Sequence, residues 1–459
     1  MGGDSWDAAL LESEVQGLVR KQRKQKQKTR QRSTTAERLA AKNLKRRAPT
    51  EQLMDDSPRQ LAAKNLKRRA PTGQRAEKPP KAAGPGVQPA AGSTCDGVNR
   101  KNFAQHLDLE RWPCGPNGKR LKVGSDCSGL DAATVALDKW GVSDRVTQEF
   151  CCDKLPECQT FLKAVHKPKL LFTDVVNRDL EKVPKVDVYT AGFPCQPWSS
   201  EGKGQGRRDE LGRGRVFDHV AKYIEKHQPK VFLLENVQAM AFKSHKKAFE
   251  AMLRTLRQSG CYFVSWRVLN ASHFGLPQSR PRLYIVGLLR TAVRSDFAGF
   301  PWPKPKVRDP LPLRRFLCGG GGVLRRAWRP DSCVALQIKE GEASIRAAGD
   351  RPHEKMFTVD AHSGRGSPST MLDKIPCLTR TRAGCGGFFV THKDFRRLLC
   401  VEEMLNLQGL PVTFRGLARD QRITDRQLAM MVGNAIPTNV LMLLLARMLT
   451  MVGLQGETR

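Results

Sequence analysis

The sequence predicts an α/β protein built around a doubly wound sheet, and two observations support this prediction. Between residues 121 and 290, seven short apolar runs alternate with segments of helical periodicity. Several runs are continuously apolar and β-branched, as parallel strands buried on both faces require. Ligands of such sheets bind at the carboxyl ends of the strands, so the residues that end the runs are the first candidates for a functional site.

The expected elements follow one another in order along the chain. The strands are residues 121–129, 145–152, 169–175, 186–193, 230–237, 261–269 and 282–289, and the helices between them are 132–140, 155–165, 216–227 and 245–260. Gly260 is expected to end the last of these helices. Helical periodicity returns in 396–411 and 426–449, which we expect to pack back on the sheet.

These patterns divide the chain into five parts. Residues 1–94 form a basic arm that we expect to be disordered, 95–120 a lead-in, 121–290 the sheet domain, 291–391 a small second domain rich in Pro, Gly and Arg, and 392–459 a segment that completes the sheet domain. The longest apolar stretch, 440–454, is short and contains Arg447, so it predicts a buried helix and no membrane span.

The basic arm has the composition of a disordered segment. Its first 90 residues hold 21 Lys and Arg against 9 Asp and Glu, with few apolar side chains to offset the entropy of ordering. The sequence LAAKNLKRRAPT occurs twice, at 39–50 and 61–72, and 77–94 resembles a linker. The KRR clusters favour nuclear import or phosphate binding, and hence a nuclear location. A solvated tail with a recent duplication is the alternative.

The overall composition excludes several classes of protein. The chain has 79 Lys and Arg against 45 Asp and Glu, a net charge of +34, which predicts a polyanionic partner such as nucleic acid. Its 13 cysteines are odd in number and none are spaced as CxxC. We therefore expect no disulfide framework, no metal site and a reducing compartment. The acidic start MGGDSWDAALLESE lacks the apolar core of a secretory signal.

Two residues at strand ends are candidates for chemistry. Cys195 follows the expected strand 186–193 and lies between two prolines. This rigid setting at a strand end favours an exposed nucleophile over the commoner buried, inert cysteine. Glu235 lies near the end of the expected strand 230–237, where an acid is costly unless it is used or paired. We interpret Glu235 as a candidate proton donor with a raised pKa.

A third group precedes the last expected strand. Gln278, Arg280 and Arg282 alternate along the sequence, so they are expected to share one face of an entering strand. The two arginines are permanent cations with donors suited to a carbonyl or phosphate oxygen.

Taken in order, these motifs resemble the DNA (cytosine-5) methyltransferase family over about residues 121–454. The matching segments are PCQPWS, ENV, QSRPR, RLLCVEEMLNLQGLP and GNAIPTNV. The resemblance implies a Rossmann-like S-adenosylmethionine-dependent methyltransferase fold with a mixed sheet, in which 121–290 is the catalytic domain and 291–391 the target-recognition domain. It also implies S-adenosylmethionine as methyl donor, a flipped-out cytosine as substrate and 5-methylcytosine as product.

The resemblance also assigns roles to the candidate catalytic residues. Cys195, as a thiolate, would add to carbon 6 of cytosine and make carbon 5 nucleophilic. Glu235 would share a proton with ring N3 and contact the exocyclic amine. Arg282 would hold the base carbonyl and Arg280 would help to position Cys195, with Gln278 counted in the same group.

The cofactor site is where the sequence departs from the family. Cys127 stands at the Phe of the first motif and Asp131 at its second Gly. The ribose-binding Glu of the family aligns with Cys151, and Glu149 or Asp153 is expected to replace it. The cofactor-binding residues that the resemblance implies are Cys127, Ser128, Gly129, Leu130, Asp153, Asp174, Val175, Gly192, Pro194, Val216, Asn434 and Ala435.

Two regions are expected to contact DNA. Residues 199–215 are rich in Gly, Arg and Lys and resemble the family's mobile loop, which closes over the duplex. An ordinary surface loop is the alternative. Residues 379–388 are a candidate groove-reading loop, with phosphate contact alone as the alternative. The expected DNA-binding residues are Gln196, Ser199, Lys203, Arg207, Arg208, Arg380 and Arg382.

We therefore expect a DNA (cytosine-5) methyltransferase that acts as a monomeric catalytic unit on a DNA duplex in the nucleus, in epigenetic regulation. Two alternatives stay open. A tRNA methyltransferase of the same family is disfavoured by the PWSS that follows PCQ. A catalytically silent chromatin protein is favoured by the divergent cofactor turn and disfavoured by the intact Cys195, Glu235 and Arg282. Glu403 is expected to support the fold.

Overall fold

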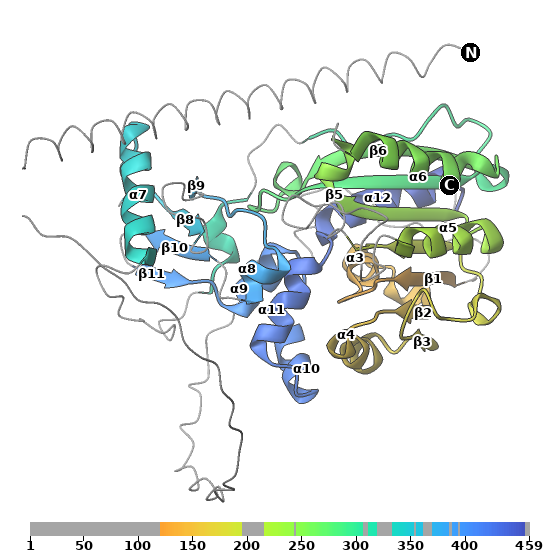
Figure 1. Ribbon diagram of the computed structural model, residues 1–459, viewed down its shortest axis with the longest axis horizontal. Coiled ribbons are helices and arrows are strands. Elements are labelled where there is room, and N and C mark those ends of the chain that lie inside the picture. The colour runs from red at the N-terminus through yellow and green to blue at the C-terminus, as the bar shows by residue number, and fades with distance from the viewer. Residues whose placement is uncertain are drawn as a thin grey trace, which may run out of the picture. The chain divides into compact units, whose positions relative to one another are not determined.

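The computed structural model describes most of the chain after residue 119 (Figure 1). The described residues are 120–194, 215–242, 245–305, 311–318, 333–352, 355–360, 370–384, 388–392 and 395–454. The chain divides into two units, Met1–Val87 and Gln88–Arg459, and every described residue belongs to the second. The predicted basic arm and nearly all of the lead-in therefore lie outside the described residues.

The centre of the second unit is a seven-stranded mixed sheet of order β3-β2-β1-β4-β5-β7-β6. Its strands are β1 (Leu121–Asp126), β2 (Val146–Cys152), β3 (Leu170–Phe172), β4 (Val188–Ala191), β5 (Val231–Val237), β6 (Tyr262–Asn270) and β7 (Pro281–Leu289). All pairs from β3 to β5 are parallel, and β7 runs antiparallel to both of its neighbours. All seven strands predicted from the sequence are confirmed.

Helices cover both faces of this sheet, as a doubly wound fold requires. They are α3 (Ala132–Trp140), α4 (Pro156–Phe161), α5 (Val216–His227), α6 (Lys246–Gln258) and α12 (Thr438–Met451). Along β5, Val231 and Leu233 pack in the core that contains α3 and α12, whereas Phe232 and Leu234 pack in the core that contains α5 and α6. This alternation explains why the strand is apolar throughout.

The predicted helix ends and the predicted buried C-terminal helix are also found. Gly260 follows α6 with a φ of 68°, and its N–H donates to the carbonyl of Arg257 at 2.9 Å. Most residues of α12 are buried in the core. Among the described helices, none is by itself long and apolar enough to cross a membrane. Only the pair Asp425–Asn434 and Thr438–Met451, taken together across a 43° bend, has the length and composition.

A second, smaller sheet lies on one side of the large one in Figure 1. It has the order β11-β10-β8-β9 and is antiparallel. Its elements are α7 (Cys333–Ala347), β8 (Phe357–Asp360), β9 (Thr370–Leu372), β10 (Phe388–His392) and β11 (Phe395–Leu398). Ile338, Ile345, Phe357, Val359 and Phe389 form its separate small core.

The edge of this small sheet differs from one sequence expectation. The pattern of residues 396–411 predicts a helix, yet Phe395–Leu398 is the edge strand β11 and α9 (Val401–Leu407) begins only afterwards. The backbone of Cys400 is extended, with φ −82° and ψ 167°, and its side chain caps α9. The small sheet thus reaches past residue 391. Glu403 supports the fold as expected, because it is fully buried and paired with Arg397.

Three further helices stand between the small sheet and the large sheet in Figure 1: α8 (Arg380–Gly384), α10 (Phe414–Asp420) and α11 (Asp425–Asn434). The backbones of α8 and α11 approach closely at Gly433. A Cβ atom there would lie 2.5 Å from the carbonyl oxygen of Thr379 and 2.7 Å from the nitrogen of Arg380. Only glycine permits this distance, because main-chain atoms cannot move aside as a flexible side chain can.

Replacing Gly433 with alanine is expected to lower the free energy of unfolding by about 1–3 kcal/mol, because the added methyl group overlaps main-chain atoms of α8. Gly416→Ala is the matched control. Gly416 lies inside a helix, and a Cβ added there would meet nothing within 4 Å, so alanine should stabilise by up to about 1 kcal/mol. Urea unfolding followed by circular dichroism measures both changes, and equal effects would contradict this account of the α8–α11 packing.

Candidate active site

The carboxyl ends of β1, β2, β4 and β5 meet where the strand order reverses, the usual ligand position in such sheets. The turn after β1 is tightly wound, because Cys127, Gly129 and Asp131 have φ values of 52°, 56° and 46°. Ser128 ties this turn to β2 by donating its N–H to the carbonyl of Cys152 at 3.0 Å. The turn therefore keeps a defined path although two of the family's expected residues are replaced.

Asp153 is the better placed of the two acids expected to replace the ribose-binding Glu. It directly follows β2, and its carboxylate accepts the N–H of Gly129 at 2.8 Å and that of Leu155 at 2.9 Å. Burial raises the pKa of this carboxyl. Glu149 lies three residues before the end of β2 and pairs with Lys169 at 3.0 Å. Of the two acids, Asp153 lies next to the turn after β1.

The remaining predicted cofactor residues occupy neighbouring strand ends. Asp174 follows β3, accepts the N–H of Val176 at 2.9 Å and lies 3.3 Å from the ammonium of Lys154. Val175 is buried in the core that contains α5 and α6, as is Val216 at the start of α5. Ala435 is buried and Asn434 is exposed at the end of α11.

These residues fit a nucleoside-bearing cofactor such as S-adenosylmethionine. No atom lies within 4 Å of a Cβ placed on Gly129, so the turn after β1 has open space beside it. Acidic side chains border this turn and the end of β3, where ribose hydroxyls and an adenine amine can be bound. The donor set is therefore suited to the predicted cofactor.

A buried ion pair at the end of β1, next to the candidate cofactor site, was missed by the sequence interpretation. Asp126 ends β1 with its side chain fully buried, and both of its oxygens accept from the guanidinium of Arg178, one of them at 2.6 Å. The hydroxyl of Tyr189 also donates to Asp126. The signal was present in the sequence, because an acid at the end of an apolar strand is the feature that singled out Glu235.

Glu235 occupies the predicted position near the end of β5. Its carboxylate is 3.1 Å from Nε of Arg282 and is almost completely buried. Burial raises its pKa, while the nearby guanidinium groups of Arg282 and Arg280 oppose that rise. A Cβ on Gly192 would lie 3.6 Å from Oε2 of Glu235, so the acid lies beside the segment that leads to Cys195. The neighbouring Asn236 steadies that segment by donating to the carbonyl of Phe193 at 3.1 Å.

Cys377 is a second residue near this site that the sequence did not single out. Its sulfur accepts from Nη2 of Arg282 at 3.2 Å and from Nη1 of Arg280 at 3.4 Å. Burial opposes ionisation of this thiol, but the two cations prevail and its pKa is lowered. Nothing in the local sequence marks Cys377, because the arginines are 95 and 97 residues away along the chain.

The expected strand face of Gln278, Arg280 and Arg282 is not formed, because β7 begins only at Pro281. Gln278 is fully buried, and its amide donates to the carbonyl of Leu407 and accepts the N–H of Leu378. Through these bonds Gln278 holds two chain segments together, and its predicted place in the catalytic group stays a prediction. The sequence interpretation assumed strand geometry where the backbone is irregular.

Arg280 is likewise buried and bonded to the main chain. Its guanidinium donates to the carbonyls of Gly433 at 3.0 Å and Ala435 at 2.8 Å, and also to that of Leu378. These bonds join the start of β7 to the segment before α8 and to the end of α11. Arg280 is also predicted to help position Cys195, and this stays a prediction because Cys195 lies outside the described residues.

Several residues predicted to take part in catalysis or DNA binding lie outside the described residues. Cys195 and the loop residues Gln196, Ser199, Lys203, Arg207 and Arg208 lie outside the described residues, whereas Pro194 is the last one described before them. The expected groove-reading loop begins as the short helix α8, not as an irregular loop. Within it, Arg382 is 2.8 Å from the buried carboxylate of Asp360.

Two solved structures share this fold. An Entamoeba histolytica methyltransferase, EhMeth, has a TM-score of 0.51 and 13% identity, with 72% of this chain and 98% of that chain covered. A putative DNA modification methyltransferase encoded within an E. coli prophage has a TM-score of 0.50 and 18% identity, with 72% and 99% covered. The sheet order and the polar residues at its carboxyl edge define the class of proteins with a Rossmann-like fold.

The family follows from the sequence comparison. Residues 121–450 match the model of the C-5 cytosine-specific DNA methylases, and the chain belongs to that family. A relative from Neisseria gonorrhoeae, the Type II methyltransferase M.NgoBI, is 31% identical over 68% of this chain and 88% of its own length. M.HaeII from Haemophilus aegyptius is 28% identical over 70% and 91%. The protein is thus a DNA cytosine-5 methyltransferase that uses S-adenosylmethionine.

The contacts of Arg280 predict a structural role that can be measured. Arg280→Met is expected to lower the free energy of unfolding by about 2–4 kcal/mol, because the buried carbonyls of Leu378 and Gly433 lose a charged donor. Arg254→Met, on the exposed side of α6, is the matched control and should change stability by less than about 0.5 kcal/mol. If chemical denaturation gives the two variants the same midpoint, the assignment of Arg280 is wrong.

Proposed function

We propose that the protein methylates carbon 5 of a cytosine flipped out of a DNA duplex, through a covalent adduct with Cys195. The observation that carries this proposal is the buried pair of Glu235 and Arg282, which lies beside Gly192, three residues before Cys195. A carboxyl and a guanidinium held together at this point match the donors that an activated pyrimidine ring requires.

Glu235 would supply the proton that the ring needs. Addition of the Cys195 thiolate to carbon 6 pushes negative charge toward N3, and a carboxylic acid there neutralises it. Burial raises the Glu235 pKa, which keeps the proton on the carboxyl to higher pH than on an exposed glutamate. Arg282 would donate to the base carbonyl while holding Glu235 in place.

The cofactor-binding residues would lie along the adjoining strand ends. Bound S-adenosylmethionine supplies the methyl group. The turn of Ser128 and Gly129 would receive its amino-acid end, Asp153 would accept from the ribose hydroxyls, and Asp174 with Val175 would contact the adenine. Gly192 leaves room between Glu235 and the side chain of Ile436, because a Cβ there would contact both.

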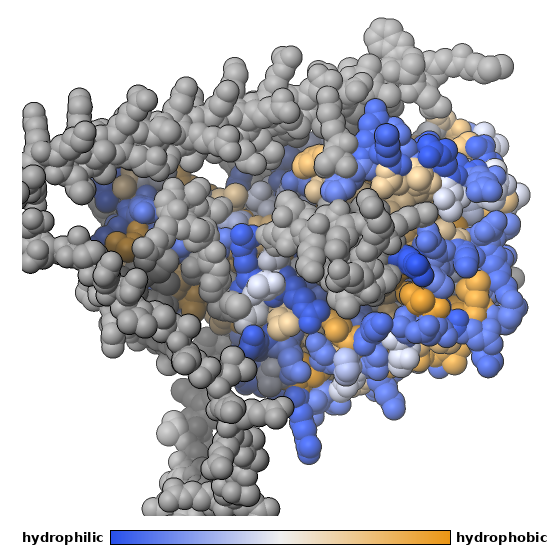
Figure 2. All heavy atoms as spheres, viewed as in Figure 1, coloured by the Kyte–Doolittle hydropathy of each residue, from blue (hydrophilic) through white to orange (hydrophobic). Residues whose placement is uncertain are grey.

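DNA binding would extend from this site along the basic part of the chain. A cytosine inside a duplex is inaccessible, so the base is extruded into the pocket. The loop that contains Gln196, Ser199, Lys203, Arg207 and Arg208 would close over the duplex and contact phosphates. Arg380 and Arg382 would face the groove or its phosphates, although Asp360 already engages part of Arg382. In Figure 2 the visible described surface carries hydrophilic areas interrupted by several hydrophobic ones.

A nuclear location and a role in epigenetic regulation stay predictions. They depend on the KRR clusters of the N-terminal arm, which lie outside the described residues. A fluorescent fusion of residues 1–94 in a eukaryotic cell would show whether the clusters direct nuclear import.

The reaction is tested by incubating the full-length protein with S-adenosylmethionine carrying a labelled methyl group and either duplex DNA or tRNA. We expect label in 5-methylcytosine of the DNA and none after Cys195→Ala, which removes the nucleophile. Label in tRNA alone would favour the RNA-acting alternative, and no label in either would favour a catalytically silent protein. Label in DNA that survives Cys195→Ala would contradict the covalent mechanism.

The role of Glu235 predicts a specific loss. Glu235→Gln keeps the size of the side chain but removes the transferable proton, so kcat is expected to fall by roughly 10²–10⁴-fold. The wild-type rate should also fall as the pH rises through the raised pKa of Glu235. The rate of the Glu235→Gln variant should not show this decrease. Glu225→Gln, exposed on α5, is the control and should leave kcat unchanged. An unaltered kcat in Glu235→Gln would exclude it as the proton donor.

A further inference from the structure

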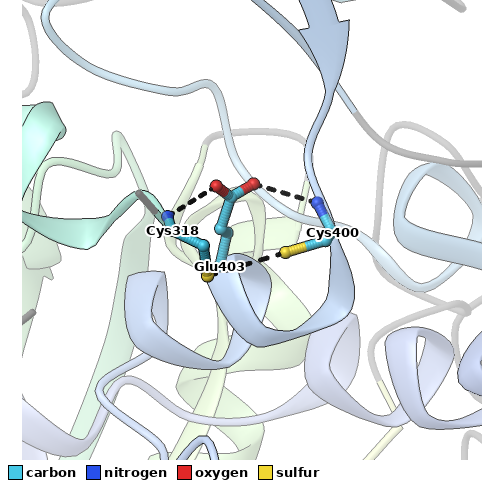
Figure 3. Close-up of side chains that lie close together, drawn as sticks. All are labelled: Cys318, Cys400 and Glu403. Atoms are coloured by element: carbon cyan, nitrogen blue, oxygen red, sulfur yellow. Dashed lines mark hydrogen bonds between the residues drawn. The ribbon is translucent and has the colours of Figure 1, made fainter. Parts of the chain in front are cut away.

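Away from the active site, two cysteines lie side by side at the base of the small sheet (Figure 3). Cys318 follows the 3-10 turn Leu313–Phe316, and Cys400 precedes α9. Their sulfur atoms are 3.8 Å apart, within hydrogen-bonding distance of each other. Both residues are half-buried.

A single buried carboxylate holds the two cysteine backbones together. Glu403 accepts the N–H of Cys318 at 2.8 Å on one oxygen and the N–H of Cys400 at 3.0 Å on the other. Arg397 donates to the same carboxylate with its two terminal guanidinium nitrogens, Nη2 at 2.6 Å and Nη1 at 2.7 Å. Because Glu403 is completely buried, the positions of the two thiols are set by a rigid support and not by chance surface proximity.

The same three side chains have the composition of a metal site, but the charges argue against one. Their ligand atoms all lie within 4.8 Å of one another. However, both oxygens of Glu403 are already bonded to the guanidinium of Arg397. A divalent cation would have to displace this partner and would then lie next to a permanent positive charge. Two adjacent thiols next to a cation favour thiol chemistry instead.

We propose that Cys318 and Cys400 are a redox-active pair: hydrogen peroxide oxidises the two thiols to a disulfide, and a dithiol reduces that disulfide back to the two thiols. The Cys400 thiolate attacks one peroxide oxygen, the O–O bond breaks, and water leaves after the departing oxygen is protonated. The Cys318 thiolate then attacks the sulfur of the resulting sulfenic acid. The S–S bond forms, the S–O bond breaks, and the leaving hydroxide takes up a proton. Two thiols are oxidised, and the peroxide is reduced to two waters.

The acidity of Cys400 agrees with its role as the attacking thiol. Its hydrogen bond with Cys318 lowers its pKa, and the backbone N–H of Glu403 bonds to its sulfur in the cap of α9. The thiolate is the nucleophilic form of cysteine, so this thiol is expected to react before the other described cysteines whose pKa is raised by burial, such as Cys152 and Cys158.

The place of the pair in the chain gives the disulfide a defined consequence. The elements α7, β8, β9, β10 and β11 all lie between Cys318 and Cys400 in sequence. A bond between the two cysteines therefore closes a ring that contains the whole small sheet. It ties together the points where the chain leaves the large domain and returns to it, which restricts the unfolded chain and stabilises the fold.

The experiment uses the full-length protein, treated with hydrogen peroxide, blocked with N-ethylmaleimide, digested without reduction and analysed by mass spectrometry. We expect a Cys318–Cys400 cross-linked peptide and a rise in Tm of roughly several degrees, both reversed by dithiothreitol. Cys318→Ser and Cys400→Ser should abolish the cross-link. Cys261→Ser, which removes another half-buried thiol on the large sheet, should retain it.

Three results would overturn the proposal. The first is the absence of the cross-link in the wild-type protein, and the second is a dominant disulfide between other cysteines. The third is one equivalent of zinc, measured by elemental analysis, that is retained by the wild type and lost in Cys400→Ser. If the serine variants do not fold, the rate of maleimide labelling of each cysteine is measured in the unaltered protein. Cys400 should react faster than Cys152. An equal or slower rate would contradict the assignment of Cys400 as the nucleophile.

Discussion

The architecture depends on one buried cation, the guanidinium of Arg280. It is bonded to carbonyls of two segments that are far apart in sequence, at Leu378 and, at the end of α11, at Gly433 and Ala435. These bonds hold the start of β7, the segment between β9 and α8, and the end of α11 around one point. Arg282, two residues later, extends from the same place to Glu235. Glu235 is therefore held by hydrogen bonds and ion pairs that join the large sheet to the segment between β9 and α8.

Much of this structure could be predicted from the sequence, because buried strands and amphipathic helices have local patterns. The seven strands, the helices Ala132–Trp140 and Val216–His227, and the place of Glu235 all follow from such patterns. The roles of Gln278 and Arg280 could not be predicted, because their partners are more than 95 residues away. Cys377 was missed for the same reason. The local pattern of Phe395–Leu398 predicts a helix, but pairing with β10 makes this segment a strand.

The turn after β1 shows how a family motif can change while its geometry persists. Two of its expected residues are replaced, yet the non-glycine residues Cys127 and Asp131 adopt the left-handed backbone that glycines would favour. That conformation is costly for side chains with a Cβ, so it must be held by neighbours. Ser128 and Asp153 provide this support through their bonds to β2 and to Gly129. The strain is thus offset by hydrogen bonds to the adjoining strand.

The packing of α12 on α3 has a consequence for how the protein is made. One helix ends at Trp140 and the other begins at Thr438, yet both belong to the same core. When all seven strands of the large sheet have left the ribosome, the helix that completes one apolar face has not yet been synthesised. Such long-range closure slows folding and leaves apolar surface exposed in the nascent chain. One apolar face of the large sheet therefore stays incompletely covered during translation, until the last helix emerges.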